Sequence, residues 1–228
     1  MRVALHLALV LTAKAVGVLH RKAINGVAVE RSVEVCGVRA YTATNTWGLE
    51  GGDVTGCRLW PSGIEAALAI GDMGDLRGVS VLEVGSGPGV ATIVAARRGA
   101  SCLSTDVHAM SNELVAAAAA DQGLRVRVGL FNLSSPPPLP AADVVVMSDL
   151  TYDLALAAAA GDRAREAADR GSRVIAAHNP LRPGCRAFRD KLGPGFTFEP
   201  VRVSAIRLHS DASNWKTRLV EVVRFDPP

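Results

Sequence analysis

Short apolar runs alternate with stretches of helical periodicity along most of the chain. The run at 79–84 is β-branched and short, as expected of a buried strand, whereas 90–98 has helical spacing and is followed by Gly99. The alternation continues as far as residue 192. The predicted strands lie at 79–84, 101–105, 125–128, 143–147 and 173–177, and the predicted helices at 64–70, 90–98, 110–121, 154–170 and 184–192.

Two further apolar runs, at 196–207 and 215–225, have no convincing helix between them and are predicted to form an antiparallel pair. Alternating strands and helices require a mainly parallel sheet with helices on both faces. The sequence therefore predicts an α/β, Rossmann-like fold with a seven-stranded, mainly parallel sheet and a C-terminal antiparallel hairpin. Alternating valines between residues 26 and 44 predict a small N-terminal β-hairpin before this sheet.

The loop of the first strand–helix unit contains three glycines at alternate positions, in the stretch VGSGPGV. Gly85, Gly87 and Gly89 would let the backbone turn sharply and approach a ligand, because glycine has no Cβ. The dinucleotide-binding fingerprint places its third glycine one position later, where this chain has Val90. Glu83 would repel a pyrophosphate, but it suits a ligand that carries an ammonium and a sulfonium. These features favour S-adenosylmethionine over a dinucleotide.

A carboxylate at the end of the following strand also indicates a nucleoside-binding site. Asp106 lies about 20 residues beyond the glycines, the distance at which an acidic side chain of a Rossmann-like unit accepts hydrogen bonds from ribose hydroxyls. The alternative for a lone glycine-rich turn is a tight connection without a ligand. Glu83, the glycines and Asp106 together favour a binding site.

Composition narrows the class of partners. At 228 residues and 49% hydrophobic content, the chain is long enough for one buried core. Its net charge is only +3, its basic residues are scattered among the acidic ones, and its aromatic fraction is 4%, which argues against nucleic-acid binding. The four cysteines and five histidines have no ligand spacing, so no metal site is predicted, and the cysteines are typical of a reducing compartment.

The N-terminal segment has basic residues but no acidic one before Glu30. Its apolar part, at 3–11, is too short to span a bilayer, so no membrane span is predicted. The segment resembles a small secretory signal or an organelle presequence, and the alternative is a terminal helix or strand that packs on the domain. We therefore divide the chain into an N-terminal extension at 1–25 and one domain at 26–228. A cytoplasmic location is expected, or a mitochondrion or other organelle if residues 1–22 are a presequence.

Four stretches carry a family resemblance: TGCRLWPSG before the first helix, VLEVGSGPGV at the glycine loop, STDVH at the second strand and VVVMSDLTYD after the fourth. Together they resemble class I S-adenosylmethionine-dependent methyltransferases, and specifically the family 16 group of protein lysine methyltransferases. The glycine loop is typical of the superfamily. The LW pair and the Asp-x-x-Tyr at 149–152 are typical of the subgroup, and the resemblance covers roughly residues 27–225.

The resemblance implies S-adenosylmethionine as the cofactor and assigns the residues around it. Trp60 would wall the site, Gly85, Ser86 and Gly87 would pass under the methionine part, Asp106 would hold the ribose, and Ser148 would line the adenosine through its backbone. Family members usually have a tryptophan after the third strand that packs on adenine. This chain has Phe131 and Asn132 there, and either of them would face the adenine.

The resemblance further implies methylation of a lysine side chain on a protein substrate. Asp149 would orient the amine, and Tyr152 would lie against it by cation–π contact. The structural alternatives are that Asp149 caps the helix that starts near residue 154, and that Tyr152 and Trp60 are packing residues. Two other functions are weighed: a small-molecule amine N-methyltransferase, and a cofactor-binding scaffold without turnover. A monomer is expected.

Overall fold

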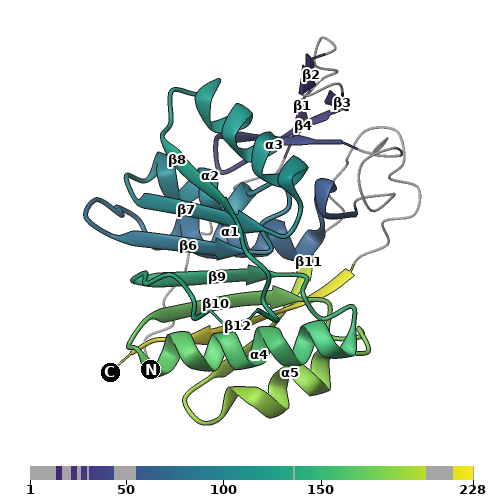
Figure 1. The fold of residues 1–228 in the computed structure, drawn as a ribbon, viewed down its shortest axis with the longest axis vertical. Helices are drawn as coiled ribbons and strands as arrows, with labels where there is room; N and C mark the ends of the chain where they lie inside the picture. Colours follow the sequence, from purple (N-terminus) through teal and green to yellow (C-terminus); the bar gives the residue numbers. More distant parts are fainter. Residues whose placement is uncertain are drawn as a thin grey trace, which may run out of the picture.

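The computed structural model describes residues 14–16, 22–24, 27–29, 31–43, 55–135, 137–203 and 218–227. Its main sheet has seven strands in the order β11–β12–β10–β9–β6–β7–β8 (Figure 1). They are β6 (Ser80–Val84), β7 (Ser101–Asp106), β8 (Val126–Leu130), β9 (Val144–Ser148), β10 (Arg173–His178), β11 (Thr197–Val203) and β12 (Arg218–Phe225). Strand β12 runs antiparallel to β10 and β11, whereas the other neighbours are parallel. The predicted fold is confirmed.

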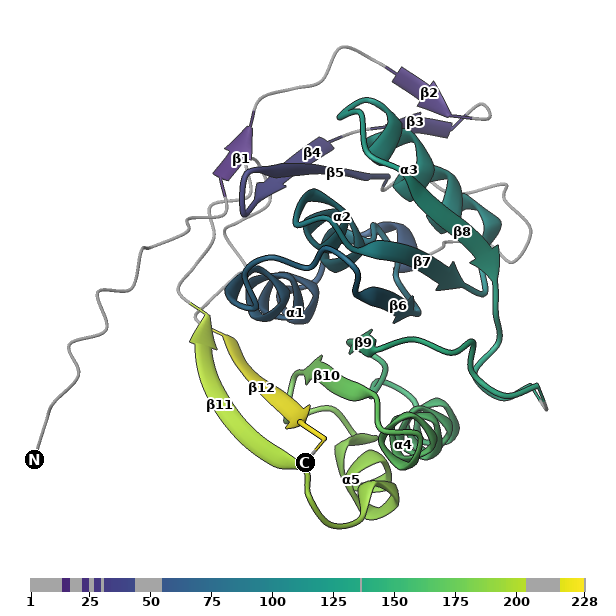
Figure 2. The same ribbon diagram turned by 90° about the vertical axis from the view of Figure 1, so that its left-hand side faces the viewer.

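Helices cover both faces of the sheet (Figure 2). They are α1 (Pro61–Asp72), α2 (Val90–Arg97) and α3 (Ala109–Ala120) on one face, and α4 (Leu154–Asp169) and α5 (Cys185–Leu192) on the other, with the short 3-10 helix η1 (Thr55–Cys57) before α1. Helix α1 begins earlier than the predicted residue 64. Pro61 explains this, because proline is favoured in the first helical turn, where its missing N–H needs no partner.

The central strand β9 has an almost continuous apolar sequence because it is buried on both faces. In β9, Val144 and Val146 belong to the core on the side of α1, α2 and α3, whereas Val145 and Met147 belong to the core against α4 and α5. Successive side chains of a strand point to opposite faces, so each position of such a strand contributes to one of two cores.

A small sheet packs outside the first helix layer. Strands β4 (Arg31–Val35) and β5 (Val38–Thr42) form a hairpin whose turn residues, Cys36 and Gly37, have φ values of 52° and 73°. Two consecutive positive φ values suit the right-handed twist of a two-residue hairpin. Strand β5 contacts α2 and α3 (Figure 2). The predicted N-terminal hairpin is thereby confirmed.

Three short strands extend this N-terminal part. Strand β1 (Lys14–Val16) pairs with β4, and β2 (Lys22–Ile24) pairs with β3 (Val27–Val29). Two of these strands lie within 1–25, so part of that segment pairs with the strands that follow it. Residues 1–13, on which the targeting interpretations mainly depend, lie outside the described residues, as do 204–207 and 215–217 of the predicted C-terminal runs.

The strand order places the candidate site. The chain runs from β6 through β7 to β8 on one side of the sheet, and β9 then returns to the other side of β6. In open α/β sheets, ligands bind at the carboxyl ends of the strands where the order reverses in this way. In the part of the chain that the structure describes, no helix is long and apolar enough to cross a membrane.

Candidate active site

A cavity of about 320 Å³ lies at the carboxyl ends of β6, β7, β8 and β9, a size typical of small-molecule sites. Every residue that the sequence assigned to the site lines it: Trp60, Glu83, Gly85, Ser86, Gly87, Asp106, Phe131, Asn132, Ser148, Asp149 and Tyr152. The cavity therefore brings together loops that are far apart in sequence.

The glycine loop requires glycine for conformation and for space. Gly85, Gly87 and Gly89 have φ values of 63°, 52° and 62°, in the left-handed region that other residues rarely adopt. A Cβ on Gly87 would lie 2.5 Å from the carbonyl oxygen of Gly56, and one on Gly85 would lie 2.6 Å from Leu150 Cδ2. The loop is therefore packed closely against two neighbouring loops of the cavity wall.

Asp106, at the end of β7, fixes the glycine loop. Its Oδ2 accepts a hydrogen bond from the Gly87 N–H at 2.9 Å, and its Oδ1 accepts one from the His108 N–H at 2.9 Å. The side chain is buried but lines the cavity. A carboxylate has about four lone-pair sites, so each oxygen keeps acceptor capacity for a ligand hydroxyl.

Glu83, at the penultimate position of β6, binds the first turn of α2. It is 1% exposed, and its Oε2 accepts hydrogen bonds from the backbone N–H (2.8 Å) and the hydroxyl of Thr92. Thr92 belongs to the first turn of α2, where backbone N–H groups have no partner within the helix. Burial raises the pKa of Glu83 to about 7, against the lowering effect of the Thr92 hydrogen bonds.

Glu83 should make stability depend on pH. Its folded pKa of about 7 lies above the reference value of 4.5, so the stabilising effect of the protonated form is complete below 4.5 and is lost as the pH rises through 7. Relative to Glu83→Gln, the wild-type protein should lose up to about 3 kcal/mol of unfolding free energy between about pH 5 and about pH 8. Urea unfolding of both proteins at the two pH values measures the free energy of unfolding. An equal change in that free energy for wild type and Glu83→Gln would contradict the prediction.

Asp149 follows β9 in a strained conformation. Its φ is 55°, which is uncommon for a residue other than glycine and is often found at functional sites. Its N–H donates to the Ala177 carbonyl at 2.9 Å, which ties the loop to β10. The carboxylate is 10% exposed, with Ser62 Oγ 3.4 Å from Oδ1 and Arg182 Nη2 3.5 Å from Oδ2.

The structural alternatives for Asp149 and Tyr152 do not hold. The cap of α4 is Asp153, whose Oδ1 accepts a hydrogen bond from the Leu156 N–H at 2.9 Å. Tyr152 is 52% exposed, which does not suit a core packing residue. Burial of its hydroxyl raises the pKa of Tyr152, and the carboxylates nearby act in the same direction. Both Asp149 and Tyr152 are therefore available to the cavity.

Arg182 is a cavity residue that the sequence did not indicate. It lies in the loop after β10, and its guanidinium carbon is 5.6 Å from the centre of the Trp60 ring, a cation–π distance. Trp60 is half-buried, precedes α1 and lines the cavity. The one available signal was the position of Arg182 after the carboxyl end of a predicted strand. His108 was missed in the same way, two residues after Asp106.

Phe131 and Asn132 differ in how their side chains are used. Asn132 is exposed, and its Oδ1 accepts a hydrogen bond from the Ser134 N–H at 2.9 Å, which forms a local turn. Phe131 is half-buried against the core of α4 and α5, and Arg163 lies over its ring at 5.7 Å. Phe131 therefore offers the cavity a supported apolar face.

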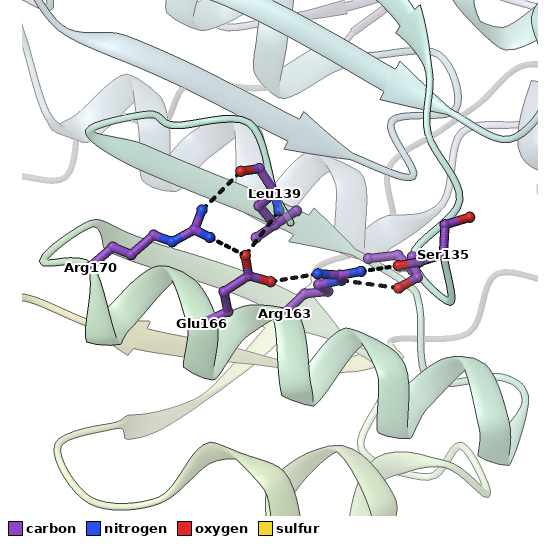
Figure 3. Close-up of polar contacts among 6 residues, drawn as sticks. Ser135, Leu139, Arg163, Glu166 and Arg170 are labelled. Atoms are coloured by element: carbon purple, nitrogen blue, oxygen red, sulfur yellow. Dashed lines mark hydrogen bonds and ion pairs between the residues drawn. The ribbon is translucent and has the colours of Figure 1, made fainter. Parts of the chain in front are cut away.

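Helix α4 holds the loop that follows Phe131 (Figure 3). Two charged side chains of the helix and the C-cap residue Arg170 bind backbone groups of that loop: Arg163 Nε donates to Leu133 O (3.0 Å), Glu166 accepts from the Leu139 N–H (2.9 Å), and Arg170 donates to Leu139 O (2.8 Å). Arg163 also binds the Ser135 carbonyl, and Glu166 is ion-paired with both arginines. The wall at 131–133 is thereby fixed relative to the sheet.

The residues present fit S-adenosylmethionine. Ser86 Oγ is buried beside the cavity and has no hydrogen-bond partner among the described residues, so a polar ligand at the glycine loop would satisfy it. A Cβ at Gly85 or Gly87 would collide with neighbouring loops, so this part of the wall consists of bare backbone. With the Asp106 carboxylate nearby, the cavity suits a nucleoside with a polar, charged tail.

Comparisons with known proteins agree with this chemistry. A family model described as lysine methyltransferase matches residues 46–179, more than half of the chain. A search of curated protein sequences finds no significant match.

Three solved structures illustrate the shared fold. A putative RNA methyltransferase from Pyrococcus horikoshii is 16% identical, with a TM-score of 0.54 over 81% of this chain and 94% of that chain. A second structure is the tRNA (uracil-54, C5)-methyltransferase of Pyrococcus abyssi in complex with S-adenosyl-L-homocysteine. It is 13% identical, with a TM-score of 0.54 over 82% of this chain, and this chain spans only 42% of the length of that enzyme. Magnesium protoporphyrin IX methyltransferase from Synechocystis PCC 6803, with bound cofactor, is 18% identical (TM-score 0.53, 71% and 77% covered).

These structures are similar in fold, but their acceptors differ: RNA, a tRNA uracil and magnesium protoporphyrin IX. The family match, in contrast, covers the segment that contains the glycine loop, Asp106 and the Asp-x-x-Tyr at 149–152. The chain belongs to the family 16 lysine methyltransferases, and it is an S-adenosylmethionine-dependent methyltransferase.

Proposed function

We propose that this methyltransferase acts on the amine of a lysine side chain in a protein substrate. The observation that carries the proposal is the position of Asp149: its carboxylate is almost buried, lies in the cavity wall and has a cation beside it. A carboxylate of this kind suits an acceptor that arrives as an ammonium. The description of the family as lysine methyltransferases supports the same acceptor.

The cofactor would be held by the residues around the glycine loop. Gly85, Ser86 and Gly87 hold the methionine part, and Asp106 holds the ribose. Phe131 provides the apolar face for adenine, Trp60 and Ser148 complete the walls, and Glu83, with a pKa of about 7, lines the same cavity. When bound, S-adenosylmethionine supplies a methyl group that its sulfonium has already activated.

The remaining task of the protein is to position the acceptor nitrogen and remove its proton. Asp149 accepts a hydrogen bond from the amine and thereby orients the lone pair, and the ammonium loses its proton to this carboxylate or to water. The Tyr152 ring, exposed at the cavity, lies against the cation. Ser62 and the backbone contact with Ala177 hold Asp149 in place.

The substrate class is tested by incubating the purified protein with methyl-labelled S-adenosylmethionine and a cell lysate. Mass spectrometry of the protein and small-molecule fractions then locates the label. Label on lysines that disappears with Asp149→Asn supports the proposal, whereas label on a small molecule supports the alternative amine acceptor. No label anywhere, with S-adenosylhomocysteine binding intact by calorimetry, would indicate a scaffold without turnover.

Phe131, the residue proposed to face adenine, gives a second prediction about cofactor affinity. Phe131→Ala should weaken S-adenosylhomocysteine binding by about 1 to 3 kcal/mol, the range for a base stacked on an aromatic ring. Asn132→Trp should leave the affinity almost unchanged, because the Asn132 side chain is exposed and bonded to its own turn. Calorimetry on both variants measures this, with melting temperatures as the control for folding. A clear gain from Asn132→Trp would instead place adenine beside position 132.

A further inference from the structure

Arg182 occupies a place that is built to hold a cation. Its guanidinium lies over the Trp60 ring at 5.6 Å, and its Nη2 lies 3.5 Å from Asp149 Oδ2. An aromatic face beside a carboxylate attracts positively charged groups through the ring quadrupole and through direct charge interaction. The ammonium of an acceptor lysine would need the same carboxylate. The Arg182 guanidinium stands close to that carboxylate and would repel a second cation beside it, so an acceptor ammonium binds more easily when Arg182 has moved away.

The position of Arg182 places it on the boundary of the cavity. A second, smaller hollow is lined by Ser62, Asn179 and Leu219, and it shares Trp60, Asp149 and Arg182 with the main cavity. These three shared residues form the wall between the two hollows. The smaller hollow, of about 10 Å³, is too small for a side chain, so an acceptor amine reaches Asp149 from the main cavity, where Arg182 also lies in the wall.

The Arg182 side chain can move without any change in the backbone. Its N–H donates to the Asn179 carbonyl at 3.0 Å, and its own carbonyl accepts from the Cys185 N–H, so the loop is fixed. The side chain itself is held loosely. It is 31% exposed, its ion pair is long, and its buried Nε has no hydrogen-bond partner among the described residues. Ion pairs between partly exposed groups contribute little stability.

Building on the proposed function, we propose that Arg182 is a latch on the acceptor site. In the free protein its guanidinium occupies the site between Trp60 and Asp149, and the acceptor ammonium displaces it toward solvent. With the latch in place, an amine reaches the Asp149 carboxylate only if its other contacts with the protein compensate for displacing the Arg182 guanidinium. Arg182 is thus a specificity-determining residue and takes no part in the chemistry.

The test compares Arg182→Gln with Arg186→Gln. Arg186→Gln is a matched control, because it also removes one positive charge from the same part of the chain. The Arg186 side chain is 92% exposed, and its ion-pair contact is with Asp190 at 3.7 Å. The probe is n-butylammonium, which has the length of a lysine side chain, titrated into each protein with saturating S-adenosylhomocysteine. We expect Arg182→Gln to bind it about two- to fivefold more tightly than wild type, the range for a weak ion pair, and Arg186→Gln to match wild type.

The outcomes separate the latch from the proposed function. If the wild-type protein binds n-butylammonium, Asp149→Asn abolishes that binding and Arg182→Gln fails to strengthen it, the latch is overturned and the proposed function stands. If neither wild type nor Arg182→Gln binds the probe, both the amine site at Asp149 and the latch are overturned. If Arg182→Gln instead weakens S-adenosylhomocysteine binding, Arg182 belongs to the cofactor site and the latch is again wrong.

Discussion

Replacing Asp149 by asparagine should reduce methyl transfer by about 10²-fold to 10⁴-fold, the usual contribution of a positioned acid–base group, and leave cofactor binding unchanged. Asparagine has the same shape and tolerates the left-handed conformation that Asp149 adopts at φ 55°. The backbone contact with Ala177 should therefore persist. The variant loses the negative charge that orients the acceptor ammonium, and with it the ion pair to Arg182. Single-turnover transfer of labelled methyl groups and calorimetry with S-adenosylhomocysteine measure the two properties separately.

A matched control for this variant lies four residues away. Asp153→Asn removes the same charge from an exposed position, and asparagine is as good a helix cap as aspartate for the N–H of Leu156. This control should keep nearly full activity. Equal losses in Asp149→Asn and Asp153→Asn would show that the general charge of the loop matters and would contradict a specific role for Asp149.

The fold was predictable because its central strands β6, β9 and β10 are buried and rich in apolar residues. Strand β9 is then apolar at every position except its last, Ser148, and the loops that separate the strands contain glycine, proline and polar residues. The short strands β1, β2 and β3 were harder to predict. Each has three residues, and their pairing depends on contacts that no local periodicity indicates.

The candidate site was predictable where residue type and spacing are local to one loop. Gly85, Gly87 and Asp106 follow predicted strands directly, so their place at the carboxyl ends followed from the topology. Arg182 was missed because its contacts with Trp60 and Asp149 join three separate loops. The capping contact of Glu83 with Thr92 also depends on how α2 packs against β6.

For the proposed adenine-facing wall, the structure shows how each of the two candidate side chains is bonded and packed. The sequence left Phe131 and Asn132 as alternatives, because the position that is usually tryptophan in the family is asparagine here. The Asn132 side chain bonds to the backbone two residues later, a habit of asparagine in turns. Arg163, from α4, lies over the Phe131 ring, and this contact between distant segments has no signal in the sequence.

Replacing Asp106 by alanine should weaken S-adenosylhomocysteine binding by at least about 3 kcal/mol, because a hydrogen bond to a charged group contributes about 1.5 to 3 kcal/mol and two ribose hydroxyls are involved. The variant also leaves the N–H groups of Gly87 and His108 without their acceptor, which loosens the glycine loop. Asp75→Asn is the charge control. Asp75 pairs with Arg77 at the surface, beyond the amino end of β6, and does not line the cavity.

Two causes would weaken binding in Asp106→Ala, and the ligand can separate them. A 2′,3′-dideoxy analogue of S-adenosylhomocysteine lacks the hydroxyls that Asp106 would hold. If the carboxylate binds the ribose, removal of the hydroxyls should weaken binding to the wild-type protein strongly and to Asp106→Ala only slightly, because the partner is already absent. If the hydroxyls matter equally in both proteins, Asp106 acts only through the backbone of Gly87 and His108, and the ribose lies against another part of the cavity wall.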